Sequence, residues 1–84
     1  MYKEEIIQQN SPGTVREAFE SVDKGQWKRV SFIDSYDQGC SFDIGDEEAI
    51  GRFLDLNGGF RAVFEPHASW SPDTVQIDCE MIAG

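Results

Sequence analysis

The chain has 84 residues, a length that fits one domain with a small core and leaves little room for a deep pocket. Apolar residues make up 39% of it, which argues against disorder despite a net charge of −9. This charge repels phosphate backbones and anionic lipid and attracts basic partners, so we expect no direct binding to nucleic acid or to membranes.

The first regular element is a predicted helix over residues 14–23. Apolar residues recur there at helical spacing, from Val15 to Val22. Thr14 followed three residues later by Glu17 is the pattern of a capping box. A Pro-Gly pair precedes the segment and a glycine follows it, so both ends carry helix-breaking signals.

Residues 26–34 and 39–45 are predicted to form the two strands of a β-hairpin. Apolar and polar residues alternate in both segments, which is the period of a strand with one buried face. Residues 35–39 join them as a polar turn cluster that ends in glycine, and their number suits a hairpin loop.

A second, shorter helix is predicted over residues 46–56. Asp46 can cap its first turn, and Glu47 and Glu48 lie where the helix dipole favours negative charge. Gly51 weakens the helix by about 1 kcal/mol relative to alanine. An Asn-Gly-Gly sequence then ends it.

Two further strands are predicted at residues 60–65 and 74–82, because both alternate with period 2. Residues 66–73 between them read as a long loop with a proline near each end. Residues 1–9 fit no period, and we interpret them as a short extra edge strand.

These elements predict one α+β domain over residues 1–84, with the order (β)-α-β-β-α-β-β. We expect an antiparallel sheet of four strands, or five with residues 1–9, and two helices on one of its faces. The other face should be polar and exposed. The predicted inner face of the sheet consists of Phe32, Phe42, Phe60, Phe64, Ile77 and Cys79.

The negative charge is unevenly spread along the chain. Residues 1–36 carry six acidic and five basic groups, whereas residues 37–84 carry ten acidic and two basic groups. The acidity therefore belongs to the second part. Solubility alone also favours acidic surfaces, and this alternative stays open.

The N-terminal residues are charged and lack the apolar stretch of a signal peptide, and no apolar run approaches the roughly 20 residues that span a bilayer. We therefore expect a cytoplasmic protein in which Cys40 and Cys79 are reduced. The cysteines and the single histidine, His67, lack the spacing of a zinc site, and we expect no metal or cofactor. Both thiols are predicted to face the core and His67 to lie in an exposed loop, so we expect no enzyme.

The densest acidic cluster consists of Asp43, Asp46, Glu47 and Glu48. Its spacing does not match a calcium-binding loop. The preference of a helix N-terminus for acids already explains the last three of these residues.

Trp27, Tyr36 and Trp70 are difficult to place in the predicted core. An exposed aromatic side chain surrounded by acids is typical of a binding hot spot. The alternative for Trp70 is that its ring folds back and covers the edge of the sheet.

The leading hypothesis is a small acidic protein that binds and blocks a basic surface of a partner protein, as an inhibitor or immunity-type protein acting on a nucleic-acid-handling enzyme. In size and charge alone, the chain resembles phage-encoded inhibitors of such enzymes. The alternative is a homodimeric structural or adaptor protein that pairs through an edge strand at residues 75–81. The predicted partner-binding residues are Tyr36, Asp37, Asp43, Asp46, Glu47, Glu48, Asp55, Trp70, Asp78 and Glu80.

Overall fold

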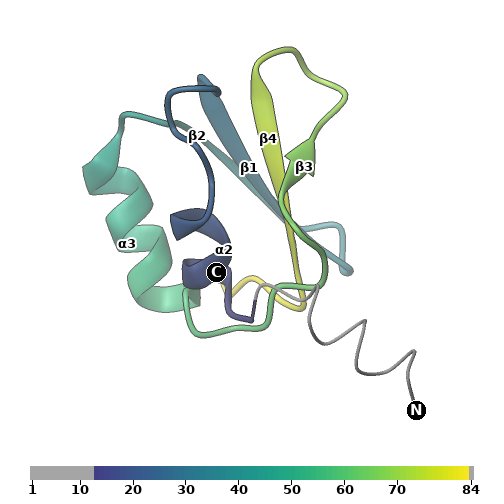
Figure 1. Cartoon of the computed structure of the whole chain (residues 1–84). Coiled ribbons are helices and arrows are strands. Elements are labelled where there is room, and N and C mark those ends of the chain that lie inside the picture. Colours follow the sequence, from purple (N-terminus) through teal and green to yellow (C-terminus); the bar gives the residue numbers. More distant parts are fainter. Residues whose placement is uncertain (1–12, 84) are drawn as a thin grey trace.

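A computed structural model describes residues 13–83 of the chain (Figure 1). The expected edge strand at residues 1–9 lies outside this range. The described residues form two helices and four strands, and the helices α2 and α3 alternate with the strands in the order α2-β1-β2-α3-β3-β4. The bounds are α2 Val15–Glu20, β1 Arg29–Asp34, β2 Gly39–Asp43, α3 Glu47–Asn57, β3 His67–Ala68 and β4 Thr74–Cys79.

The strands form one mixed sheet in the order β2-β1-β4-β3. β1 pairs antiparallel with β2 and parallel with β4, and β4 pairs antiparallel with β3. The α+β class is thus confirmed, but the wholly antiparallel sheet was wrong. A period-2 pattern shows which side chains share a face and carries no information about strand direction. The expected free edge at residues 75–81 was also wrong, because β4 lies between two strands.

The strand expected at residues 60–65 was wrong as well. Arg61 and Ala62 form only isolated bridges. The chain pairs with β4 again in β3, directly after Pro66, which has no N–H to donate to a ladder. Beside this interruption, Phe64, which was expected in the core, is 62% exposed.

Both predicted helix caps are confirmed. The Thr14 N–H donates to Glu17 Oε1 at 2.9 Å, and the Glu17 N–H donates to Thr14 Oγ1 at 3.2 Å, which is a complete capping box. The Ala49 N–H donates to Asp46 Oδ1 at 3.2 Å at the start of α3. α2 is shorter than expected and ends at Glu20.

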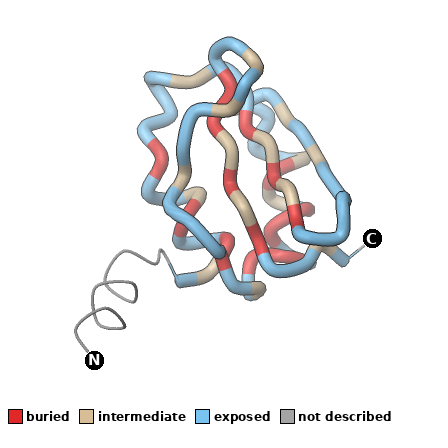
Figure 2. The backbone as a smooth tube through the Cα atoms, turned by 90° about the vertical axis from the view of Figure 1, so that its right-hand side faces the viewer, coloured by how far each residue is buried: buried red, intermediate tan, exposed pale blue. Residues whose placement is uncertain are grey.

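The Phe32 ring lies at the centre of the core. Its centroid is 6.2 Å from that of Phe19 in α2, 4.3 Å from that of Phe53 in α3 and 6.0 Å from that of Phe42 in β2. Both helices therefore cover the same face of the sheet, as expected. Buried and intermediate positions alternate along β1 and β4 (Figure 2). Trp27, which was difficult to place in the core from the sequence, is half-buried and packs against it.

The carboxyl group of Asp34, at the end of β1, is buried and joins two distant segments. Its Oδ1 accepts the N–H groups of Tyr36 at 2.8 Å and Gln38 at 2.9 Å, and its Oδ2 accepts the N–H of Ile82 at 2.8 Å. Burial raises the pKa of the Asp34 carboxyl, but the three backbone donors outweigh it and hold this pKa below its ordinary value of 3.8.

Asn57, at the end of α3, holds the next residue of the same C-terminal segment. Its Oδ1 accepts the Ala83 N–H at 2.7 Å, and its Nδ2 donates to the Phe53 carbonyl at 3.2 Å. The C-terminal segment is therefore fastened to β1 through Asp34 and to α3 through Asn57.

We expect Asp34→Asn to lower the free energy of unfolding, because the amide offers one acceptor oxygen and turns an N–H₂ group toward a backbone donor. Since the pKa of Asp34 is lowered on folding, its stabilisation is present above pH 3.8 and is lost as the pH falls through the folded-state pKa. Denaturant unfolding between pH 2 and 7 measures both effects.

Asp37→Asn is the matched control for this prediction. Asp37 lies in the same turn with a φ of 63°, which asparagine also tolerates, and none of the described residues contacts its carboxylate by a hydrogen bond or ion pair. The free energy of unfolding of the Asp37→Asn variant should change little. Equal effects of the two substitutions would contradict the role assigned to Asp34.

Candidate functional site

The predicted partner-binding residues lie at two opposite ends of the sheet. Tyr36, which is 71% exposed, and Asp37 occupy the turn between β1 and β2. Glu80 follows β4 at the same end, where its carbonyl accepts the Ser35 hydroxyl at 3.4 Å. We call this region the turn end of the sheet.

Four of the other acids lie where β2 passes into α3, at the opposite end of β2, whereas Asp55 lies near the end of α3 and Asp78 lies in β4. Asp43 ends β2, Asp46 caps α3, and Glu47 and Glu48 form its first turn. We call residues 43–48 the acidic segment. Because β2 separates it from the turn end, the structure does not bring all predicted acids together.

Trp70 lies in the loop between β3 and β4, at the same end of the sheet as the acidic segment but toward the opposite edge (Figure 1). The carbonyl of Asp73 in this loop accepts the N–H groups of Lys28 and Arg29 at the start of β1. Trp70 is 93% exposed, so the alternative in which its ring covers the sheet edge was wrong. Tyr36 and Trp70 are at opposite ends and cannot anchor one small contact together.

Several of the predicted acids are already engaged within the chain, and Asp46 is used as a cap. The side chains of Asp37, Glu47 and Glu80 make no hydrogen bond or ion pair with the described residues. Of these three, only Glu47 belongs to the acidic segment. The engaged pairs are Asp43 with Arg29 at 3.0 Å, Glu48 with Arg52 at 3.1 Å, Asp55 with Arg16 at 3.8 Å and Asp78 with His67 at 2.6 Å.

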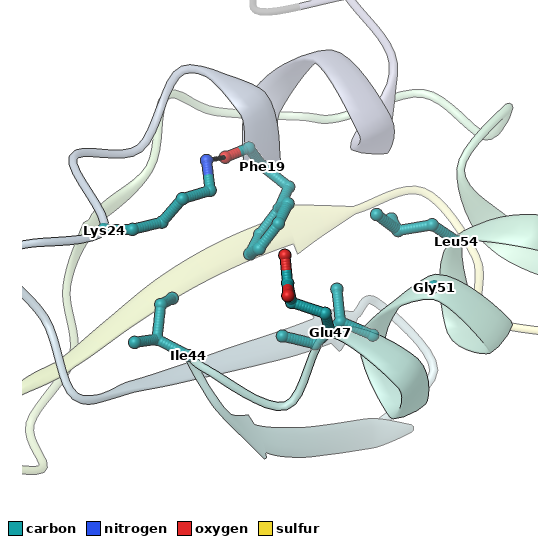
Figure 3. A pocket seen from close by; sticks show the side chains of 7 residues that line it. Phe19, Lys24, Ile44, Glu47, Gly51 and Leu54 are labelled. Carbon is teal, nitrogen blue, oxygen red and sulfur yellow. Dashed lines mark hydrogen bonds between the residues drawn. The ribbon is translucent and has the colours of Figure 1, made fainter.

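An apolar pocket of about 220 Å³ opens beside the acidic segment, between the two helices (Figure 3). We call it the helix pocket. The sequence does not predict this pocket, because its walls come from three separate segments. Its lining residues are Phe19, Lys24, Ile44, Glu47, Ile50, Gly51 and Leu54.

The two charged residues of the helix pocket differ in the contacts that their charged groups make. Lys24 Nζ donates to the carbonyls of Phe19 at 2.8 Å and Val22 at 3.2 Å, and it lies 4.4 Å from the Phe19 ring centroid. The ammonium group thus binds backbone carbonyls at the C-terminal end of α2 and just beyond it. The Glu47 carboxylate points from α3 toward Phe19 (Figure 3) and makes no hydrogen bond or ion pair with the described residues.

Gly51 lies in the middle of α3, and a Cβ added there would meet nothing within 4 Å. By contrast, a Cβ at Gly58 would lie 2.5 Å from the Leu54 carbonyl oxygen, so close packing explains that glycine. No contact requires a glycine at position 51. The space in front of it belongs to the helix pocket. The destabilising effect of Gly51 on the helix could be predicted from the sequence, but its position beside a pocket could not.

His67 lies in β3 and not in a loop as expected. Its Nε2 is 2.6 Å from Asp78 Oδ2, and Gln76 Nε2 donates to Asp78 Oδ1 at 2.8 Å. His67 Nδ1 lies 3.2 Å from the Ala68 carbonyl oxygen. The hydrogen bond to Asp78 raises the pKa of His67 and partial burial opposes it, with a net rise above 6.5.

The thiol of Cys79 is buried on the core face of β4 and donates to the Ile33 carbonyl at 3.4 Å. Burial is the main cause that raises its pKa to about 11, so it stays protonated near neutral pH. Within residues 13–83, no group of three or more His, Cys, Asp and Glu side chains could hold a metal ion. No helix of this range is long and apolar enough to cross a membrane.

The chain was compared with models of protein families, with curated proteins and with solved structures, and none of them matched. The candidate site therefore rests on the geometry and charge of this chain. Its strongest feature is the helix pocket with the acidic segment at its mouth.

We expect the His67–Asp78 pair to stabilise the fold most at low pH. Because the pKa of His67 is raised on folding, the contribution is complete below its unfolded value of about 6.5 and is lost as the pH rises through the folded-state pKa. His67→Ala should therefore cost about 0.5–1 kcal/mol near pH 5.5 and less at pH 8.5, as measured by urea unfolding. A cost that grows with pH would contradict the assignment.

Proposed function

We propose that this chain binds a basic surface of a partner protein and thereby blocks it. The observation that carries the proposal is the position of Glu47, an acid without a partner among the described residues, at the mouth of an apolar pocket. The neighbouring acids of the segment 43–48 and the net charge of −9 add to the negative field there.

The two parts of this site have separate physical roles. Negative charge accelerates encounter with a basic partner and makes association sensitive to salt. Apolar contact slows dissociation, because it removes surface from water. A pocket beside an unpaired acid on an acidic chain therefore suits an inhibitory contact that forms quickly and lasts.

The concrete form of the proposal is an inhibitor or immunity-type protein acting on a nucleic-acid-handling enzyme. Such enzymes carry Lys- and Arg-rich grooves for phosphates, and an acidic domain of this size can occupy one. We propose that a phage genome encodes the protein, because its size and charge resemble those of phage-encoded inhibitors. We place this role in the cytoplasm, where these enzymes work and free thiols such as Cys40 and Cys79 stay reduced. The role is binding and involves no catalysis or cofactor.

We expect Glu47→Lys to weaken partner binding about 3- to 10-fold, chiefly through slower association, because it places a positive charge where the partner is basic. The partner is first isolated on the immobilised chain at low salt and identified by mass spectrometry. Its affinity for the purified chain is then measured by biolayer interferometry from 50 to 500 mM salt.

Glu65→Lys makes the same charge change at another exposed acid that has no described side-chain partner and lies outside the helix pocket. It should reduce the affinity less. Affinity that does not fall with salt, or equal losses for the two substitutions, would overturn the electrostatic contact at this site.

A homodimeric structural or adaptor protein is the second candidate function, and the edge of β2 that pairs with no described strand favours it. The Ile44 N–H donates to the Lys28 carbonyl at 2.8 Å, and the Asp34 N–H donates to the Gln38 carbonyl at 3.0 Å. Antiparallel pairing alternates between bonded and non-bonded pairs, so the N–H and C=O of Ser41 point to the free edge.

A groove of about 360 Å³ runs beside this edge, with Phe42 and the exposed Leu56 among its lining residues. Two copies paired antiparallel about Ser41 would place Asp43 opposite Gly39, which avoids contact between like charges. Such a pair would join the two sheets into one.

For this second candidate we expect a dimer in sedimentation equilibrium that weakens when Leu56→Glu adds charge beside the edge. Val63→Glu, at another exposed apolar residue that lies outside the groove, is the control. A monomer at all concentrations up to 500 μM would reject the homodimer and leave the inhibitory proposal unaffected.

A further inference from the structure

We infer that the helix pocket receives one apolar side chain of leucine or phenylalanine size from the partner, and that Lys or Arg residues flank this side chain and face Glu47. The inference rests on the proposed function and specifies the chemistry of the partner segment. Its evidence is the size and lining of the pocket, the unexplained Gly51 and the charge at the rim.

The size of the pocket fits a single side chain. Its volume is about 220 Å³, and Ile44, Ile50 and Leu54 contribute apolar walls opposite the Phe19 ring. A cavity of about 150 Å³ with similar walls is enough to hold benzene. The helix pocket therefore suits one leucine- or phenylalanine-sized group.

Gly51 keeps this space open. Glycine in the interior of a helix lowers its stability, and no close contact requires it at this position. A larger residue there would project into the pocket and fill it. The helix thus carries a destabilising residue at a position that lines the pocket. We attribute this glycine to the space that the partner's side chain needs.

The rim favours a basic flank for the occupant. The carboxylate of Glu47 makes no hydrogen bond or ion pair with the described residues. The ammonium group of Lys24 is held by two carbonyls and by the Phe19 ring. A partner segment with Lys or Arg beside its apolar residue would place positive charge near the free Glu47 carboxylate.

The test uses fluorescent synthetic heptapeptides in 50 mM salt. One has the sequence Lys-Arg-Lys-Leu-Lys-Arg-Lys, one has alanine at its centre, and one has leucine at its centre with glutamine at the other positions. We expect the basic leucine peptide to bind at least about fivefold more tightly than either of the others. Its NMR shift changes should centre on Phe19, Ile44 and Gly51.

Gly51→Leu should abolish the difference between the leucine and alanine peptides, because the new side chain fills the pocket. Gly59→Leu adds the same side chain outside the pocket, where it also meets nothing within 4 Å, and should preserve the difference. Circular dichroism melting confirms that both variants fold. Gly51→Ala should melt at a higher temperature than the original chain while still discriminating between the peptides.

The outcomes separate the two proposals. If the two basic peptides bind equally and their binding falls with salt, the pocket inference is overturned and the acidic contact survives. If the uncharged leucine peptide binds as tightly as the basic one, the basic flank is wrong. Failure of every peptide to bind overturns the inference, whereas the proposed function is decided by the salt and charge-reversal experiment on the isolated partner.

Discussion

The buried carboxylate of Asp34 is the interaction on which the arrangement of the sheet and its surroundings depends. It stands at the end of β1, the strand that pairs with β2 on one side and β4 on the other. Through backbone N–H donors it holds the turn before β2 and the segment after β4. An ionised group is buried here at low cost because three donors replace its hydration. Asn57 extends the same C-terminal attachment to α3, so the two helices and the sheet close around one Phe32-centred core.

This closure also determines which parts of the surface are open to partners. The turn end is occupied by the tightly bonded turn and the C-terminal segment. At the other end, residues of both helices together with Ile44 line the helix pocket. Glu47 lies there without an internal partner, whereas acids such as Asp43 and Glu48 are balanced by arginines of the same chain. Of the predicted acids without a described partner, Glu47 lines the helix pocket, whereas Asp37 and Glu80 lie at the turn end.

Much of the local structure could be predicted from the sequence, and little of the site. Thr14 and Asp46 were recognisable as caps, because a cap depends on residues only three positions away. The inward position of Phe32 followed from period-2 alternation. The pocket could not be predicted, since Phe19 and Leu54 meet only after both helices pack on the sheet. The pairing of His67 with Asp78 was hidden for a related reason, because it depends on the register of a two-residue strand after Pro66.

The sequence by itself determined the size of the core, the two helices with their caps, the alternating faces of the strands and the excess of negative charge. These properties follow from composition and from spacing along a short stretch of chain. The tertiary structure decided the parallel pairing of β1 with β4, the burial of Asp34, the exposure of Phe64 and which acids keep a free charge. Those features arise from contacts between segments far apart in the chain, and their free energy depends on geometry that no local pattern encodes.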